Sequence, residues 1–474
     1  RRTIAERLGR LYASRISDAK TPAERAEIER RGRELLERVP GSDSFDLRLT
    51  LGRATYLRAE QLAERHRIGL TTEEEAEEAR TTLRDASESF GRLADRVQRR
   101  VEVLERRESR GGATGGSLDA LRSLLTDVRR QRSLAMYYAG WSTYYLALLT
   151  DRADLAADAR IRFGYLLNGE GQSPTLERLP KGLLRYEHVA RAAVGVALAS
   201  SLMGEHGQAS MWLDAVDEAE QLPEPVRDQL FRRRLTILAE AGRWSTLRSH
   251  VDQRIETRTG EEELLATVEA RLLAVRLLES RSRNFGGARG EARAALLELA
   301  LSSLVRRGEI GHVLDLVDRY GTLPLGNEGF IVRYVRGVRS YESARDAHRA
   351  AGVDAQKPTD DVRLQGMYHD ASRALAAAID AEDAGDFSDE RGRATLLRGL
   401  SLFYKGDAAQ ASRAFERASS ISTDQSERAE AVWLAIVAAE DASERGTPDM
   451  EPRVEQLSAL FIDTFPEDER AARL

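Results

Sequence analysis

The residues whose spacing most directly suggests chemistry form a row of arginines on one predicted helix. The row consists of Arg333, Arg336 and Arg339, with Tyr334 beside it. A spacing of three places the guanidinium groups in a slowly turning row on one side of a helix. Because guanidinium groups bind carboxylates through paired hydrogen bonds, the row could act as a carboxylate clamp. The alternative is a solvated helix face on which the arginines pair with Glu342 and Asp346.

A cluster of aromatic residues is the second candidate for binding. The members that share one helical face are Tyr137, Trp141, Tyr144 and Tyr145. Tyr and Trp combine a large apolar area with a polar tip, so these residues could line a groove for a peptide or a glycan. The same residues could instead form a core at the base of a helical hairpin, and the residue types alone do not decide between the two.

Most familiar catalytic and cofactor chemistry is excluded by residue type or by spacing. The chain has no cysteine, which excludes disulfides, cysteine-ligated metal sites and cysteine nucleophiles. None of the seven histidines lies three or four residues from another, so no helix presents a histidine pair to a metal ion. The glycine-rich segments 111–117 and 286–290 lack the lysine of a phosphate-binding loop. We therefore expect no metal, no cofactor and no enzymatic activity, with a helical-toroid enzyme as a remote alternative.

Charge and hydropathy limit the possible partners. The chain carries 72 basic and 78 acidic residues, a net charge of −6, and so lacks the basic excess of a general nucleic-acid-binding protein. It contains no run of 18 apolar residues, which predicts no membrane span. The chain starts at Arg1 rather than Met, as it would after removal of a secretion signal. Together with the missing cysteines, this slightly favours a bacterial periplasm or cell envelope over the cytoplasm.

The elements that must position these groups are helices. Apolar residues recur at helical spacing almost everywhere, and prolines and glycines fall between the periodic segments. The most regular pattern is an apolar stripe whose spacing alternates between three and four residues. It consists of Ala76, Ala79, Leu83, Ala86, Phe90, Leu93 and Val97, continued by Val101 and Leu104. The glycine-rich loop 111–117 and a second striped helix follow, which predicts a long antiparallel hairpin over 71–150.

A recurring signature begins at about residue 150. In each copy a glycine is followed five residues later by a small or aliphatic residue, and four residues after that by a larger apolar one. The four glycines are Gly204, Gly242, Gly308 and Gly406. Their intervals of 38, 66 and 98 residues lie near multiples of about 33, a period typical of stacked helix pairs.

Residues 395–424 resemble a tetratricopeptide repeat. The residues that carry the match are Gly399 and Leu402 in the first helix, Gly406 at the turn, and Ala411, Phe415 and Ala418 in the second helix. The resemblance implies an all-α fold, namely a right-handed α-solenoid of stacked antiparallel helix pairs. It also implies a concave surface for a protein or peptide partner. The arginine row would lie on that inner face, where members of this family commonly grip peptide ends.

These features divide the chain into four predicted segments. They are N-terminal helical repeats over 1–70, the hairpin over 71–150, degenerate repeats over 151–345 and C-terminal repeats over 346–474. The predicted function is that of a non-enzymatic scaffold for a protein or peptide. The alternative is an assembly subunit of a cell-envelope or other complex, which forms a homo-oligomer through the hairpin.

Overall fold

A computed structural model describes residues 2–19, 21–39, 44–110, 116–167, 172–256, 264–279, 288–321, 329–352, 354 and 356–474. Within these ranges the regular elements are α-helices and short 3-10 helices, and no residue lies in a strand. The predicted all-α class is therefore confirmed. The chain divides into two compact units, unit 1 (1–247) and unit 2 (248–474). The boundary falls inside α10 (Trp244–Glu256).

Unit 1 is a stack of helices in chain order. Its helices before α10 are α1 (Arg2–Asp18), α2 (Pro22–Glu37), α3 (Phe45–Arg67), α4 (Glu73–Ser109), α5 (Gly116–Thr150), α6 (Ala153–Leu167), α7 (Glu187–Leu202), α8 (His206–Asp217) and α9 (Glu224–Glu240). Short 3-10 helices at Leu176–Arg178 and Lys181–Leu183 join α6 to α7.

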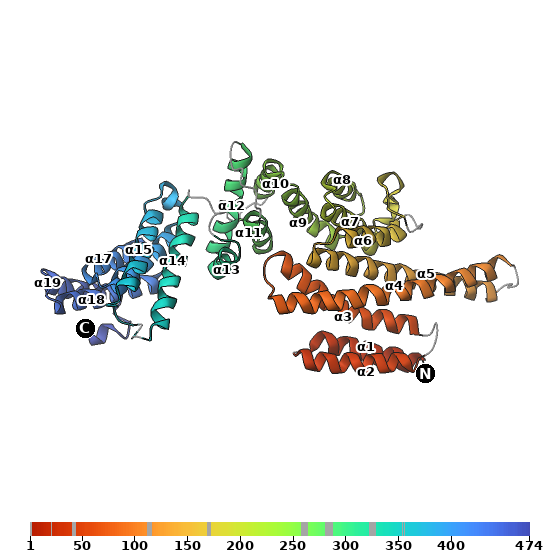
Figure 1. Cartoon of the computed structure of the whole chain (residues 1–474), viewed down its shortest axis with the longest axis horizontal. Coiled ribbons are helices and arrows are strands. Elements are labelled where there is room, and N and C mark those ends of the chain that lie inside the picture. Colours follow the sequence, from red (N-terminus) through yellow and green to blue (C-terminus); the bar gives the residue numbers. More distant parts are fainter. Residues whose placement is uncertain are drawn as a thin grey trace. The chain divides into compact units, whose positions relative to one another are not determined.

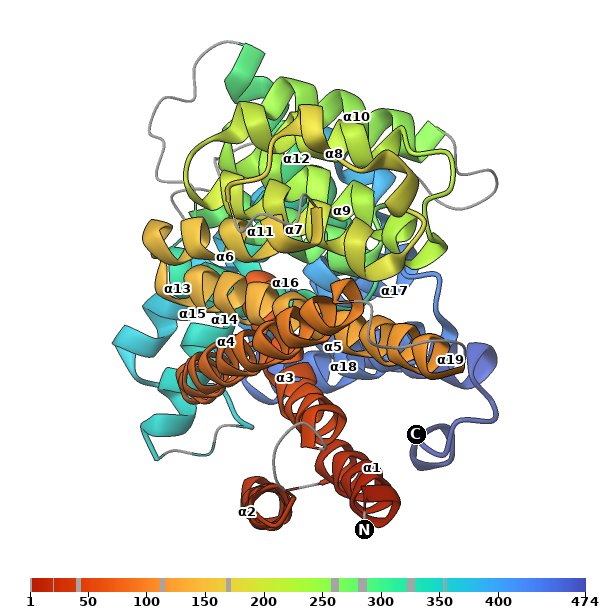
Figure 2. The same cartoon turned by 90° about the vertical axis from the view of Figure 1, so that its right-hand side faces the viewer.

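The packing within unit 1 is that of a two-layered helical repeat. Helices α3, α5, α7 and α9 contact one another in succession, and we call them the odd-helix layer. Helices α4, α6 and α8 each pack against the helix before and the helix after it. Figure 1 and Figure 2 show the same order from α3 through α8. Because each helix contacts mainly its neighbours in the chain, the arrangement is a solenoid.

The long hairpin predicted from the apolar stripe is confirmed as the pair α4 and α5. A capping box starts α4, in which the Thr72 side chain accepts from the backbone of Glu75 and the Glu75 side chain accepts from the backbone of Thr72. The two helices run antiparallel, since Ser87 bonds Thr143 near one end and Glu105 pairs with Arg129 near the other. All nine residues of the stripe from Ala76 to Leu104 are buried in this chain. Residues 111–115 of the predicted loop lie outside the described residues.

Unit 2 continues with shorter helices. They are α11 (Thr267–Glu279), α12 (Ala288–Arg306), α13 (Ile310–Tyr320), α14 (Phe330–Ala350), α15 (Val362–Ile379), α16 (Ser388–Lys405), α17 (Ala408–Ile421), α18 (Gln425–Glu444) and α19 (Met450–Thr464). Short 3-10 helices lie at Glu382–Asp386 and Ala471–Arg473. From α14 to α19 each helix packs against the next, and α14 also contacts α16, so this unit has the same repeat-like packing.

The four signature glycines occupy the same place in four helix pairs. Gly204, Gly242, Gly308 and Gly406 have φ angles of 78°, 63°, 77° and 96° and end α7, α9, α12 and α16. In every copy the amide after the glycine donates to the carbonyl five residues earlier, with an N–O distance of 2.9 Å. This is the Schellman closure of a helix, which needs a left-handed residue that glycine adopts at little cost. The repeat signature is thus a repeated turn geometry.

Two further glycines make the same closure but lack the apolar residues that complete the sequence signature. Gly69 and Gly446 have φ angles of 75° and 78°, and the following amides donate to carbonyls five residues earlier. The positions five and nine residues beyond both glycines hold glutamates rather than apolar residues. None of the described helices has the length and apolarity needed to cross a membrane.

Candidate functional site

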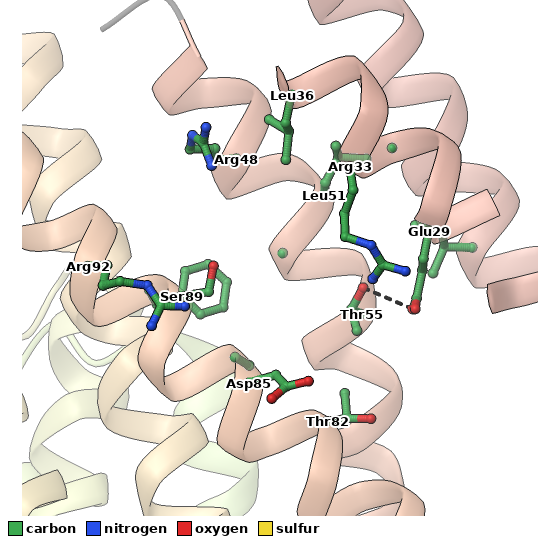
Figure 3. Close-up of a pocket in the computed structure, with 15 residues that line it drawn as sticks. Glu29, Arg33, Leu36, Arg48, Leu51, Thr55, Thr82, Asp85, Ser89 and Arg92 are labelled. Atoms are coloured by element: carbon green, nitrogen blue, oxygen red, sulfur yellow. Dashed lines mark hydrogen bonds between the residues drawn. The ribbon is translucent and has the colours of Figure 1, made fainter. Parts of the chain in front are cut away.

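A groove in unit 1, shown in Figure 3, combines apolar and charged lining residues. It lies over α3, with α1 and α2 on one side and α4 on the other, and has a volume of about 340 Å³. Its lining is mixed. Ile16, Leu36, Leu51, Ala86 and Phe90 supply apolar atoms, and Glu29, Arg33, Arg48, Thr55, Thr82, Asp85, Ser89 and Arg92 supply polar ones. The combination of an apolar floor and a polar rim is typical of binding sites. We call it the α2–α4 groove.

Two glycines shape the floor of the groove. A β-carbon on Gly52 would lie 2.8 Å from Cζ of Phe90, so α3 and α4 approach closely at this point. A β-carbon on Gly32 would lie 3.4 Å from Cδ1 of Leu51, so α2 rests closely on α3. The Thr55 hydroxyl of α3 donates to Glu29 of α2 at 3.2 Å. These contacts fix the wall formed by α2 relative to the floor.

Positive charge gathers at one end of the α2–α4 groove. Gly52 faces Phe90 across an antiparallel helix pair, so Arg48 on α3 and Arg92 on α4 lie toward the same end. Burial, and then the nearby charge of Arg96, lowers the pKa of Arg48. Arg92 pairs with Glu88 at 3.1 Å in an exposed position. Among the described residues no carboxylate pairs with Arg48 or Arg96, so this end of the groove is positively charged. The two carboxylates of the lining, Glu29 and Asp85, lie toward the other end with Thr55 and Thr82 (Figure 3).

A second concentration of charge lies within the odd-helix layer. Arg233 of α9 donates to Glu64 of α3 at 2.9 Å, and the hydroxyl of Tyr145 donates to the same carboxylate at 2.8 Å. Arg67 donates to the hydroxyl of Tyr144 at 2.5 Å. The side chains of Arg67 and Arg233 are 2% and 11% exposed, whereas that of Glu64 is 33% exposed. We call these five residues the Glu64 network.

The pKa values of the Glu64 network indicate a structural role. Burial opposes the ionisation of Glu64, but the charges of Arg233 and Arg67 outweigh burial and hold its pKa at about 2. Burial also raises the pKa of Tyr145 and of Tyr144. The carboxylate is therefore ionised and its two arginines are charged, while the two phenols are neutral. A fully ionised carboxylate held by two arginines is a poor general acid or base at neutral pH.

One grouping in unit 1 contains the residue types of a hydrolase triad. The hydroxyl of Ser201 lies 3.2 Å from Nδ1 of His206 and donates to Glu240. In a triad the histidine accepts the serine proton and the carboxylate orients the histidine. Here the serine lies between the other two groups and is itself 3% exposed, so the arrangement does not activate a nucleophile. In the part of the chain that the structure describes, no group of three or more acidic or histidine side chains is placed to hold a metal ion.

The aromatic residues singled out from the sequence lie together in the interior of unit 1. Tyr137, Trp141, Tyr144 and Tyr145 are between 1% and 6% exposed. Trp141 contacts the rings of Tyr144 and Tyr145 at centroid distances of 5.5 and 5.4 Å. The structure thus places them as core at the base of the hairpin, which was the packing alternative, and we do not include them in the proposed binding surface.

The arginine row of α14 is engaged by its own unit. Arg333 donates to the carbonyl of Ala377 on α15 at 3.1 Å. Arg339 pairs with Asp318 of α13 at 2.6 Å, rather than with the two acidic residues that follow it on α14. Arg336 is half-buried, and Tyr334 is buried and stacked on Phe330 at 5.6 Å. The carboxylate clamp on this row stays a prediction.

The lining of the α2–α4 groove was not identified from the sequence. Its residues come from four helices spread over positions 16–92, and the apolar ones have the spacing of ordinary core residues. The only local signal was the pair Gly32 and Gly52, because a glycine inside a helical pattern often marks a close approach of two backbones.

Comparisons with known proteins add little to the geometry. No family model and no curated protein sequence matches the chain. Two solved chains are similar in structure. One is described as a circular tandem repeat protein with novel repeat topology and enhanced subunit contact surfaces. It is 11% identical, the alignment covers 100% of this chain and 97% of that chain, and the TM-score is 0.21. The description as a helical repeat protein therefore rests on the packing and the glycine turns.

Proposed function

We propose that this protein is a non-enzymatic interaction scaffold of the tetratricopeptide-repeat type, which binds a segment of a partner protein in the α2–α4 groove. The observation that carries the proposal is the groove itself. It combines an apolar floor, a polar rim and a rigid helical frame in a volume of about 340 Å³, which suits the side chains of a peptide segment.

The helical frame supports a binding role. In a solenoid each helix is held by its neighbours, so grooves between successive helices keep their shape without a ligand. A preformed groove reduces the entropy lost on binding. The Arg25–Glu78 ion pair at 2.9 Å links α2 to α4 and further restrains the two sides of the groove.

The alternative, self-association through the hairpin, receives less support. The apolar stripe that would mediate it is already buried against this chain's own helices. A second copy could use that stripe only after α4 separated from its neighbours, which would expose nine buried residues. We therefore favour binding in the groove over assembly through the stripe of α4.

The proposal is tested by filling the groove from its exposed rim. Ser89 of α4 is exposed and lines the groove, so Ser89→Trp adds an indole there without disturbing the core. Arg84→Trp adds the same indole to an exposed position of α4 that does not line the groove. Affinity capture of the full-length chain from its native cell, with mass spectrometry, is expected to enrich a partner with wild-type protein and Arg84→Trp but not with Ser89→Trp. Equal capture by all three proteins would contradict the proposal.

A further inference from the structure

The charge of the α2–α4 groove restricts its partner, and this inference rests on the proposed function. We infer that the groove takes an acidic amphipathic peptide helix of a partner protein. Apolar side chains of that helix would contact Leu51 and Phe90. Its carboxylates would meet Arg48 and Arg92.

The dimensions of the groove fit one face of a short helix. Thr82 and Arg92 mark its extent along α4, and ten residues of helix span about 15 Å. A peptide helix of about ten residues has the same length and presents apolar side chains at positions i, i+3, i+4 and i+7. A volume of about 340 Å³ receives a few such side chains, while the peptide backbone stays at the rim.

The charges of the groove favour an acidic peptide over a basic one. Arg48 donates to Ser44 and pairs with no carboxylate among the described residues. Burial and the like charge of Arg96 lower its pKa, in keeping with a site that would accept a negative charge. Arg92 lies toward the same end of the groove as Arg48, whereas Arg33 points toward Thr55 and Glu29 (Figure 3). The acidic lining residues Glu29 and Asp85 lie toward the other end of the groove (Figure 3), so partner carboxylates are favoured only at the end with Arg48 and Arg92.

The partner carboxylates would therefore pair with Arg48, which has no carboxylate partner among the described residues, and would join Glu88 at Arg92. They would bind at the end of the groove where α3 begins and α4 passes Phe90. The apolar face of the peptide would cover the floor next to Gly52, where α3 and α4 are closest.

The inference is tested with a phage-displayed library of random dodecapeptides, selected on the full-length chain. Enriched peptides are then synthesised with a fluorescent label and titrated by anisotropy. We expect them to combine Asp or Glu with Leu, Ile or Phe at helical spacing, and to bind more weakly as NaCl is raised from about 50 to 300 mM, because exposed charges are then screened.

Charge reversal at the rim gives the decisive comparison. Arg92→Glu replaces an exposed groove residue at the positive end, and Arg84→Glu makes the same change on exposed α4 outside the groove. We expect Arg92→Glu to weaken peptide binding at least about tenfold and Arg84→Glu to change it less than about twofold. Circular dichroism checks that both variants keep the helical fold.

The outcomes separate this inference from the proposed function. Enriched peptides that are basic, or that bind Arg92→Glu as tightly as wild type, would overturn the inference but leave a peptide-binding scaffold. Selection that enriches no peptide on the wild-type chain would overturn both.

Discussion

Gly399 of α16 lies so close to the ring of Phe415 on α17 that a β-carbon on Gly399 would be 2.5 Å from Cδ1 of Phe415. No real β-carbon tolerates that distance, so the two helices can approach only because residue 399 has no side chain. Phe415 is 1% exposed, and neighbouring residues hold its ring in place. Gly399 and Phe415, both singled out from the sequence, thus form a small–large pair where α16 meets α17.

Replacing Gly399 with alanine should therefore destabilise unit 2. We expect a loss of about 1–3 kcal/mol in the free energy of unfolding, because the added methyl group overpacks the contact with Phe415. Urea denaturation followed by circular dichroism measures the change. The matched control is Gly366→Ala in α15, where a β-carbon would meet nothing within 4 Å. It should gain about 0.5–1 kcal/mol from the better helix propensity of alanine. A stabilised Gly399→Ala variant would contradict the tight contact.

The signature glycines should be required for their backbone angle rather than for space. Gly308 has a φ of 77° and open space around its missing β-carbon. Gly308→Ala should cost about 1–2 kcal/mol of stability, because the left-handed conformation disfavours a β-carbon. Gly311→Ala lies three residues further on, inside α13, also in open space, and should be neutral or slightly stabilising. Equal effects of the two substitutions in thermal unfolding would show that φ at residue 308 does not matter.

The sequence predicted the features that depend on local spacing. The glycines at 204, 242, 308 and 406 were identified because the turn and the next helix follow within ten residues. The α4–α5 pair was predicted because an apolar stripe of this length needs a partner helix. In both cases the physical cause lies within one or two neighbouring elements.

The candidate site could not be predicted from the sequence because it depends on contacts between helices that are far apart in the chain. Arg233 and Glu64 are 169 residues apart and meet only when α9 stacks on the odd-helix layer. The aromatic residues from Tyr137 to Tyr145 have the same types whether they form a core or line a groove, and only their burial distinguishes the two. The positive end of the α2–α4 groove likewise depends on Arg48 facing α4 across the α3–α4 contact.

The arginine row of α14 should be partly structural. Replacing Arg333, Arg336 and Arg339 together with alanine removes the hydrogen bond to the Ala377 carbonyl and the ion pair with Asp318. Each such bond contributes up to about 1 kcal/mol at a partly exposed position, so we expect a total loss of about 1–2 kcal/mol in thermal unfolding. The control is Arg373→Ala, since Arg373 is 78% exposed and meets Asp370 only at 3.9 Å. Unchanged stability of the triple variant would instead favour the carboxylate clamp.

The Glu64 network should make unit 1 sensitive to acid. The pKa of Glu64 falls from its ordinary 4.5 to about 2 because Arg233 and Arg67 outweigh the effect of burial. A carboxyl group with a lowered pKa in the folded state stabilises the fold above pH 4.5, and this contribution is lost as the pH falls from 4.5 toward 2. Glu64→Gln should lower the free energy of unfolding at pH 7 by roughly 1–3 kcal/mol, less than for a fully buried ion pair because Glu64 is one-third exposed. The difference from wild type should shrink as the pH falls through that range, as measured by urea denaturation at pH 7, 4 and 3.

Glu74→Gln, at an exposed position of α4, is the matched control and should be neutral. Wild-type and Glu64→Gln curves that stay parallel from pH 7 to pH 3 would show that the Glu64 carboxylate is not held by its arginines.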